Sequence, residues 1–199
     1  MFKKIKRFLD LLFAFLAIIF SSPIFIIIAI LIKAEDNGPI IFSQIRVGKN
    51  GKYFKIYKFR SMKYEKSKYH SGGEFDSSIE TLKSARMRFK TTKLNDNRFT
   101  KVGKIIRSIH FDELPQLINI SRNQMSFVGP RPDVPSQEAD YDIDQWKRRI
   151  LVKPGLTGLA QVSRISTPAD RNRYDRYYVE NISFKLDFLI LIRTIFKVF

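Results

Sequence analysis

The chain has 199 residues, about the length of one domain, which excludes a large multidomain assembly. It contains 36 Lys and Arg against 19 Asp and Glu, for a net charge of +17, and its 44% hydrophobic content excludes a disordered chain. The absence of cysteine and the presence of only two histidines also exclude a disulfide framework, a thiol nucleophile and a Cys- or His-rich metal site. The excess positive charge indicates a polyanionic partner: nucleic acid, anionic lipid or a phosphorylated metabolite.

The first predicted element is an uncharged apolar segment from Leu11 to Ile32. As a helix rising ~1.5 Å per residue, it matches the thickness of a bilayer's hydrocarbon core, so we expect it to lie in a membrane. A signal peptide has an apolar core of only about 7–15 residues followed by a small-residue cleavage site, and this segment fits neither condition. The simplest alternative is a single spanning helix that serves as an anchor.

Ser22-Pro23 interrupts this segment near its middle, where proline removes a backbone donor and favours a kink. Both flanks are basic: four of the first seven residues are Lys or Arg, and residues 44–107 hold 18 Lys and Arg against 5 Asp and Glu. Basic flanks favour the cytoplasmic side. We therefore predict a re-entrant helix broken at Ser22-Pro23 in an anchoring domain, residues 1–36, and a cytoplasmic, interfacial domain, residues 37–199.

The remainder is typical of an α/β mixed (α+β) fold. Two runs rich in Ile, Phe and Tyr, 40–47 and 53–59, flank Asn50-Gly51, a strong β-hairpin signal. The polar stretch 64–95 is predicted to be an insertion with one short helix near 79–89. Further helices are expected at 101–109, 112–121 and 171–180, with turns or extended backbone at 129–132 and 153–155.

The last predicted element is an amphipathic helix from Phe184 to Phe199. Lys185, Arg193 and Lys197 fall on one face of an otherwise apolar helix, a pattern typical of a helix lying on a membrane. A helix that packs its apolar side on the domain core would show the same pattern, so both interpretations stay open.

Asp112-Glu113 is an adjacent acidic pair in a basic region, followed by Leu114-Pro115 and an apolar helical stretch. Pro115 at an early helical position places the pair at a helix N-terminus, where an N-cap and first-turn acid would explain it structurally. The same helix end would hold Asp112 ionised and offer N–H groups to a phosphate. Adjacent carboxylates also suit Mg²⁺, so the pair is a candidate nucleophile and metal ligand.

Several basic residues are candidates to neutralise a transferring phosphoryl group. Arg131 stands out because Gly129-Pro130-Arg131-Pro132 is a stiff segment that presents one long cation at low entropic cost. The others, each of which would otherwise be a solvated surface charge, are Lys58, Arg60 and Arg107. No known nucleotide-binding glycine motif is present, although Lys153-Pro154-Gly155-Leu156-Thr157-Gly158 is glycine-containing.

Three segments carry a family resemblance: YKFRSM at 57–62, DNRFTKVGKIIRSIHFDELPQLINISRNQMSFVGPRP at 96–132 and KPGLTGLAQV at 153–162. Together they closely resemble the bacterial sugar transferases, and within them the small monotopic phosphoglycosyl transferases. The resemblance extends from the Ser22-Pro23 break to YYVENISFKLD at 177–187.

This resemblance implies transfer of a sugar-1-phosphate from a UDP-sugar to undecaprenyl phosphate, releasing UMP and starting lipid-linked glycan synthesis. It implies that Asp112 attacks the phosphorus nearest the sugar and carries a covalent phosphosugar, while Glu113 helps to hold Mg²⁺. The phosphate-binding residues implied by position are Arg107 and Arg131 with Lys58 or Arg60, and the candidates for uridine contacts are Lys153, Thr157 and Gln161.

The resemblance also implies a monotopic protein on the cytoplasmic face of the bacterial inner membrane, in contact with membrane lipids and with downstream glycosyltransferases, but not with nucleic acid. Two positions depart from the family: Leu159 replaces a Trp that is usual there, and Phe111 replaces a Leu. The change at Leu159 makes the sugar unsafe to infer from better-known members. A length of 199 residues corresponds to the minimal, catalytic-core form.

Three alternatives stay open. In the first, the chain is a basic membrane-tethered binding protein without turnover, although it has no RNA-binding or helix-turn-helix pattern. In the second, it is an inactive family member that acts as an assembly scaffold. In the third, it catalyses the same reaction through a ternary complex, with Asp112 as general base.

Overall fold

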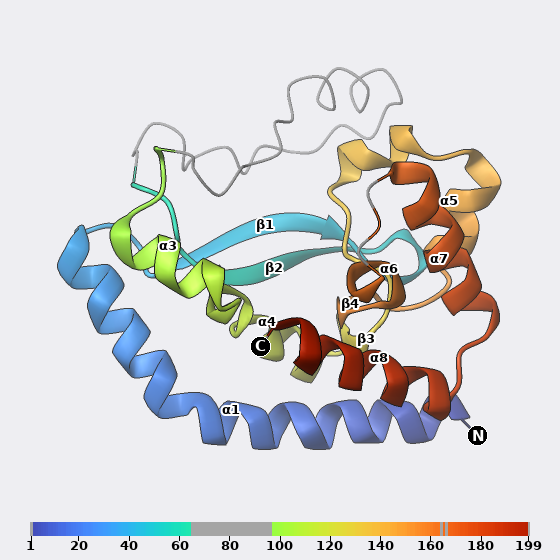
Figure 1. Cartoon of the computed structure of the whole chain (residues 1–199), viewed down its shortest axis with the longest axis horizontal. Coiled ribbons are helices and arrows are strands. Elements are labelled where there is room, and N and C mark those ends of the chain that lie inside the picture. The colour runs from blue at the N-terminus through green and yellow to red at the C-terminus, as the bar shows by residue number, and fades with distance from the viewer. Residues whose placement is uncertain (1, 65–96, 164, 166, 199) are drawn as a thin grey trace.

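The computed structural model describes residues 2–163 except 65–96, together with residue 165 and residues 167–198. It confirms a mixed helical and sheet fold with one long apolar N-terminal helix. Most of the predicted insertion at 64–95, with its short helix, lies outside the described residues. The elements are α1 (Phe2–Glu35), β1 (Ile41–Val47), the 3-10 turn η1 (Lys49–Gly51), β2 (Tyr53–Phe59), α3 (Lys101–Ser108), the 3-10 turn η3 (Phe111–Glu113), α4 (Gln116–Ser121), β3 (Ser126–Val128), the 3-10 helix η4 (Pro135–Asp140), α5 (Ile143–Arg149), β4 (Gly155–Thr157), α6 (Leu159–Val162), α7 (Pro168–Glu180) and α8 (Phe184–Val198) (Figure 1).

Helix α1 is bent rather than broken. It is one continuous helix with Pro23 inside it, and Figure 1 shows it turning part-way along, so that two arms enclose an angle. Pro23 leaves the carbonyl of Ile19 without its usual N–H partner. The Ser22 hydroxyl donates to that carbonyl at 2.7 Å, and the Ser21 hydroxyl donates to Ala17 O at 2.5 Å. The predicted break at Ser22-Pro23 is therefore wrong: the helix continues through Pro23, where the Ser22 hydroxyl replaces the missing donor at Ile19 O.

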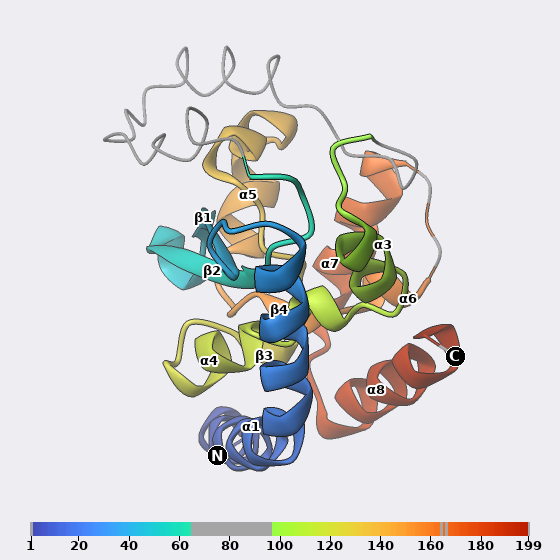
Figure 2. The ribbon, with the colours of Figure 1, turned by 90° about the vertical axis from the view of Figure 1, so that its left-hand side faces the viewer.

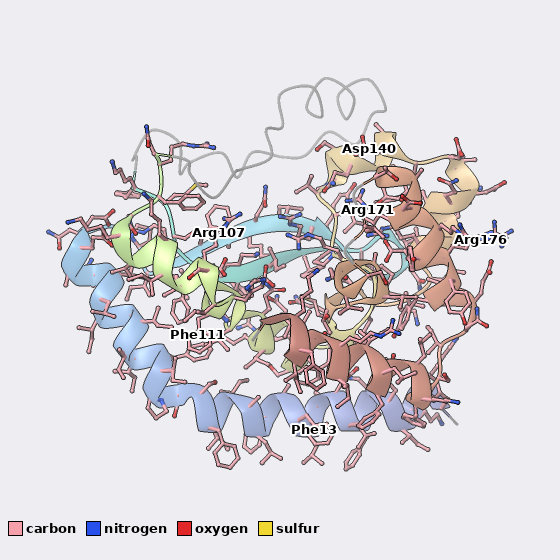
Figure 3. The ribbon with its side chains drawn as sticks, viewed as in Figure 1. Phe13, Arg107, Phe111, Asp140, Arg171 and Arg176 are labelled. Carbon is pink, nitrogen blue, oxygen red and sulfur yellow. The ribbon has the colours of Figure 1, made fainter. Side chains whose placement is uncertain are left out.

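Both arms of α1 pack against the rest of the chain along their inner side. Ala14 on the first arm joins a core cluster with Ile56 and Ile120, and Ile28 on the second arm packs with Phe59. The outer side is apolar and exposed, and Figure 3 shows Phe13 pointing away from the domain. Among the described helices, only α1 is long and apolar enough to cross a membrane.

Each end of α1 is tied to the same body by polar contacts. Near its start, the Arg7 guanidinium donates to Ile120 O at 2.8 Å, at the carboxyl end of α4. At its other end, the Glu35 carboxylate accepts from the backbone amides of Lys101 at 2.5 Å and Val102 at 2.9 Å, which caps the start of α3. The bend is thus fixed from both sides.

The hairpin predicted around Asn50-Gly51 is confirmed. Strands β1 and β2 pair antiparallel from Ile41 opposite Phe59 to Val47 opposite Tyr53. Asn50 (φ 57°) and Gly51 (φ 75°) take left-handed backbone conformations in the turn. Asparagine and glycine adopt positive φ more readily than other residues, which is why they favour such a turn.

A second, parallel pair was not predicted from the sequence. Strand β3 lies beside β4, with Ser126 opposite Gly155 and Val128 opposite Thr157. A side chain on Gly155 would collide with the backbone of Gly129, so glycine allows this close approach. The pair brings the segment after β3, which carries Arg131, beside the Pro154-Gly155 segment.

Helix α8 packs one side on the domain core, as one of its two interpretations predicts, and leaves other apolar side chains exposed. Ile190 is fully buried against Tyr178 and Leu159, whereas Phe188 and Phe196 are exposed. Its start lies against that of α1, where Lys6 and Asp187 form an ion pair of 2.6 Å and the rings of Phe2 and Phe184 are 4.6 Å apart. Figure 2 shows α8 and the first arm of α1 at the same end of the molecule.

Candidate active site

A sharp reversal after α3 positions the acidic pair. His110 adopts a left-handed conformation (φ 60°), and the chain then enters the η3 turn that contains Asp112 and Glu113. Phe111 and Leu114, on either side of the pair, pack against the cluster formed by Ile28, Ile32, Phe59 and Ile106. The pair is therefore held in a 3-10 turn just before α4, whose N-cap is Pro115, close to the predicted helix N-terminus.

Glu113 is paired with a cation from the hairpin. The Lys58 ammonium on β2 lies 2.5 Å from Glu113 Oε1, and both side chains are largely shielded from solvent. Burial acts to raise the pKa of Glu113, but the charges of Lys58 and Arg131 outweigh it and hold that pKa below its usual value. Glu113 is therefore an anion at neutral pH, and Lys58, predicted from the sequence as a phosphate-neutralising cation, lies beside it.

Asp112 is buried, with 6% of its surface exposed. Burial raises its pKa above the usual value, and the charge of Glu113 acts in the same direction, while Lys58 and Arg107 act against it. Loss of water around the carboxylate is the largest of these effects, whereas the sequence analysis considered only the helix end. A raised pKa makes an ionised carboxylate more basic, which favours attack on phosphorus.

A narrow recess lies beside Glu113 and brings several predicted residues together, although Asp112 does not line it. Three cations from separate parts of the chain line it. Its polar lining comprises Arg46, Lys58, Glu113, Gln116, Arg131 and Gln161. Such a concentration of cations around one carboxylate suits a ligand with several phosphate charges.

Arg46 and Gln116 were missed at the sequence level. The hairpin register held a signal for Arg46, because Phe42 pairs with Lys58 and residues two apart share a face, which puts Arg46 and Lys58 on one face of the hairpin. Burial lowers the pKa of Arg46 to about 10, and the charge of nearby Arg131 acts in the same direction. No comparable pattern singles out Gln116.

Other predicted residues lie elsewhere or have other contacts. Arg60 is buried and forms an ion pair with Asp36, just beyond α1, so Lys58 and not Arg60 faces Glu113. Arg107 lies over the ring of Phe99 at 4.8 Å, near enough to Asp112 to affect its pKa. Figure 3 shows Arg107 on α3, the helix that precedes the acidic pair.

The three predicted uridine candidates are separated. Gln161 lines the recess, but the Thr157 hydroxyl pairs with that of Thr194 at 2.7 Å. Lys153 donates to Asn123 Oδ1 and lines a different pocket with Arg7 and Lys49, beside the first arm of α1. Burial and these neighbouring cations lower the pKa of Lys153 to about 8.

The carboxylates of the acidic pair suit Mg²⁺ better than a metal that takes all of its ligands from the protein. Nowhere in the described part of the chain do three or more His, Cys, Asp or Glu side chains gather. Mg²⁺ commonly takes one or two carboxylates and completes its shell with water and phosphate oxygens. Asp112 and Glu113 would be the two carboxylates of such a site, and Glu113 already accepts from Lys58.

Comparison with known proteins gives the class to which this fold and site belong. The chain matches the family model described as "Bacterial sugar transferase" over residues 1–199, and it belongs to this family. This confirms the resemblance carried by residues 57–62, 96–132 and 153–162.

Particular relatives refine the comparison. The chain is 40% identical to the UDP-N-acetylgalactosamine-undecaprenyl-phosphate N-acetylgalactosaminephosphotransferase of Aeromonas hydrophila, over 96% of this chain and 43% of that protein. It is 39% identical to the UDP-glucose:undecaprenyl-phosphate glucose-1-phosphate transferase of Klebsiella pneumoniae, over 98% of this chain and 40% of that protein. It is 40% identical to the exopolysaccharide production protein ExoY of Sinorhizobium fredii, over 96% of this chain and 83% of that protein. The chain thus spans about two fifths of the first two relatives.

Proposed function

We propose that the chain transfers a sugar-1-phosphate from a UDP-sugar to undecaprenyl phosphate, releasing UMP and starting a lipid-linked glycan. The observation that carries the proposal is the buried Asp112, which lies near enough to Lys58 for that charge to affect its pKa, while Glu113 and Lys58 line a recess with Arg46 and Arg131. The activities of two relatives, both undecaprenyl-phosphate sugar phosphotransferases, support it. Since these relatives carry different sugars, the sugar of this chain stays open.

In the proposed reaction, a carboxylate oxygen of Asp112 attacks the phosphorus nearest the sugar. The bond from that phosphorus to the oxygen bridging the two phosphates breaks, and UMP leaves with the bonding electron pair. An oxygen of undecaprenyl phosphate then attacks the same phosphorus and displaces the Asp112 carboxylate. The product is an undecaprenyl diphospho-sugar, and the enzyme returns to its starting state.

The surrounding cations supply the electrostatic part of this reaction. Lys58, Arg131 and Arg46 would neutralise charge that shifts from the bridging oxygen to the departing UMP, which is the main requirement of phosphoryl transfer. Mg²⁺, held by Asp112 and Glu113, would supply further charge neutralisation at the phosphate oxygens when bound. Lys58 also orients Glu113 through its 2.5 Å contact.

A covalent intermediate can be tested by intact mass spectrometry. We expect that brief incubation of the purified chain with Mg²⁺ and a pool of UDP-sugars, without lipid acceptor, adds the mass of one sugar phosphate. The same treatment of Asp112→Asn should leave its mass unchanged. An unmodified parent that nevertheless turns over once acceptor is added would instead support the ternary-complex alternative. An unmodified parent without turnover would support the scaffold.

The proposed membrane arrangement is re-entrant, with both ends of α1 on the cytoplasmic face of the bacterial inner membrane. A straight helix of 34 residues would extend about 50 Å and separate its ends across a bilayer. Instead, Arg7 and Glu35 near the two ends both bind the same domain. The exposed apolar residues of α8 and of the first arm of α1 lie at the same end of the molecule, where both would meet lipid.

Cysteine accessibility tests this arrangement. In intact cells, Lys4→Cys and Lys33→Cys should both be protected from a membrane-impermeant maleimide added outside, and both should react after the inner membrane is opened. A lysine on the exposed hairpin surface, Lys52→Cys, is the matched cytoplasmic control. Labelling of one terminal position from outside and of the other only from inside would contradict the re-entrant arrangement and support a single span.

A further inference from the structure

The backbone around Arg131 is held at four consecutive carbonyl oxygens. Two of the four donors are backbone amides and two are arginine side chains from different elements. Pro130 O accepts from Gly155 N at 2.9 Å, Arg131 O from Arg149 Nη2 at 2.7 Å, Pro132 O from Arg46 Nη1 at 3.0 Å, and Asp133 O from Val47 N at 2.9 Å.

The two prolines explain why arginine side chains, rather than the amides of a neighbouring strand, donate to two of these carbonyls. Pro130 and Pro132 carry no N–H, so this segment cannot form the regular ladder of a strand on either side of Arg131. Proline fixes φ but leaves ψ free, so the direction of the Arg131 side chain still depends on how the peptide planes around Arg131 are held. Hydrogen bonds to the Arg131 and Pro132 carbonyls fix the peptide planes on which that direction depends.

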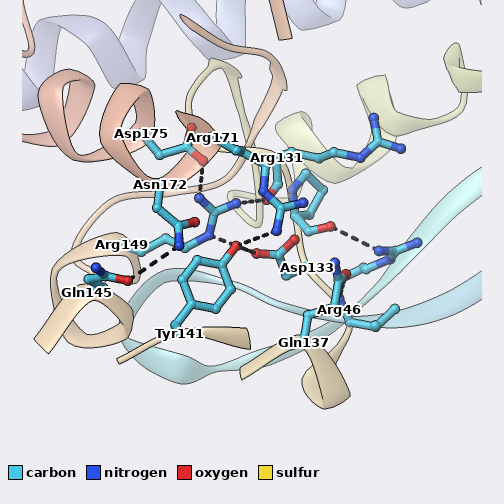
Figure 4. Close-up of polar contacts among 12 residues, drawn as sticks. Arg46, Arg131, Asp133, Gln137, Tyr141, Gln145, Arg149, Arg171, Asn172 and Asp175 are labelled. Atoms are coloured by element: carbon cyan, nitrogen blue, oxygen red, sulfur yellow. Dashed lines mark hydrogen bonds and ion pairs between the residues drawn. The ribbon is translucent and has the colours of Figure 1, made fainter. Parts of the chain in front are cut away.

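Arg149 is the more firmly fixed of the two arginine donors. It is 8% exposed, and its guanidinium has one partner for each nitrogen: Nε lies 2.9 Å from Asp133 Oδ2, Nη1 pairs with Asp175 and Nη2 donates to Arg131 O. The Tyr141 hydroxyl donates to Asp133 at 2.5 Å (Figure 4). Two buried carboxylates thus hold the guanidinium in the orientation that directs Nη2 to the carbonyl.

The side chain of Arg131 itself is exposed and lines the recess with Glu113 and Lys58. Nothing in the described structure holds its guanidinium in a hydrogen bond or ion pair that would fix it from the far end. Its position is therefore set from the backbone.

We propose that Arg149 is a positioning residue: through the Arg131 carbonyl, it fixes the direction in which the Arg131 side chain enters the recess. This inference rests on the proposed function, in which Arg131 binds the phosphates of the donor. Arg149 does not itself line the recess. The planar fork of arginine is needed because lysine cannot serve two carboxylates and a carbonyl in one plane.

The first test is independent of activity. In Arg149→Lys, hydrogen–deuterium exchange should become faster at the amides of Val47 and Gly155, which donate to the Asp133 and Pro130 carbonyls, because the segment that accepts these bonds loses its anchor at Arg131 O. The matched control is Arg148→Lys, which is adjacent on α5, exposed, and paired only with Glu180 at the surface. Parental exchange rates in Arg149→Lys would overturn the proposal, whatever the chain's activity.

The second test is a double-mutant cycle with UDP as the probe ligand, read by calorimetry on the full chain in detergent. Arg149→Lys should weaken UDP binding about tenfold in the parent but produce no further loss in an Arg131→Ala background. Equal losses in both backgrounds would mean that Arg149 acts on the whole fold and would overturn the proposal. If Arg149→Lys does not fold, Tyr141→Phe, which loosens Asp133 without leaving an unpaired charge, takes its place in the cycle.

The two hypotheses fail differently. Parental UDP affinity in Arg131→Ala would contradict the role of Arg131 in the proposed function, while faster exchange in Arg149→Lys would still support the anchoring of the segment. Loss of affinity in Arg131→Ala together with additive losses in the cycle would keep the proposed function and reject Arg149 as its positioning residue.

Discussion

Replacing Asp112 with Asn is expected to lower UMP release by at least about 10³-fold, because an amide of the same shape cannot form the acyl phosphate bond on which the proposed cycle depends. The measurement is a coupled assay of UMP with saturating UDP-sugar, Mg²⁺ and undecaprenyl phosphate. The matched control is Asp144→Asn, an exposed acid in the first turn of α5, which should keep parental turnover.

The same substitution should leave the fold intact or make it more stable. Burial raises the pKa of Asp112, so its ionised form costs stability at any pH above the pKa of the unfolded chain. The neutral amide avoids that cost, and the thermal midpoint of Asp112→Asn should equal or exceed the parental value at neutral pH. Full turnover in Asp112→Asn would contradict the proposed nucleophile, and a lower midpoint would show that lost activity reflects lost structure.

The sequence predicted those parts of the fold that local patterns determine. The Asn50-Gly51 turn, the flanking strands and the amphipathic C-terminal helix each depend on residues close together in the chain. The parallel pair β3–β4 was missed because it joins Ser126 to Gly155 through three-residue strands, and such short runs carry no periodicity. The kink at Pro23 was predicted, but the continuity of α1 depends on a rotatable serine hydroxyl, which sequence spacing does not reveal.

The site was predicted in part for a similar reason. Asp112, Glu113, Lys58, Arg131 and Gln161 were found from the residues and the resemblance, and they meet around one turn and one recess. Arg60 and Lys153 were grouped with them because they stand in the motifs YKFRSM and KPGLTGLAQV that carry the family resemblance. Which way a side chain turns beyond the end of a strand depends on distant partners: Asp36 in one case and Asn123 in the other.

The hydrogen-bond network around Arg149, which holds the Arg131 backbone, could not be predicted from the sequence. Asp133, Tyr141, Arg149 and Asp175 belong to four different segments, and their contacts form only when α5 and α7 pack together (Figure 4). Burial raises the pKa of the Tyr141 hydroxyl and of the Asp175 carboxyl, so both are costly to ionise without their partners. Each of these residues, taken alone in the sequence, looks like an ordinary surface group.

Replacing Lys58 with Met is expected to lower UMP release about 10²-fold at neutral pH and to move the acidic limb of the pH–activity profile upward. The positive charge of Lys58 lowers the pKa of both Asp112 and Glu113. Without it both pKa values rise, and a smaller fraction of Asp112 is ionised at any mildly acidic pH. Part of the lost activity should therefore return as the pH is raised, whereas the loss of the cation from the recess persists at every pH.

The pairing of Lys58 with Glu113 also determines how Lys58→Met changes the stability of the fold at different pH values. The pKa of Glu113 is lower in the folded chain than in the unfolded chain, so its pairing stabilises the fold above the unfolded pKa and is lost as the pH falls through the folded value. Lys58→Met should lower the thermal midpoint at pH 7 and have a smaller effect near pH 4. Lys55→Met is the matched control on β2, because Lys55 is exposed and points to the opposite face of the hairpin. Lys58→Arg should restore the acidic limb, and an unmoved limb in Lys58→Met would mean that ionisation of Asp112 does not control the reaction.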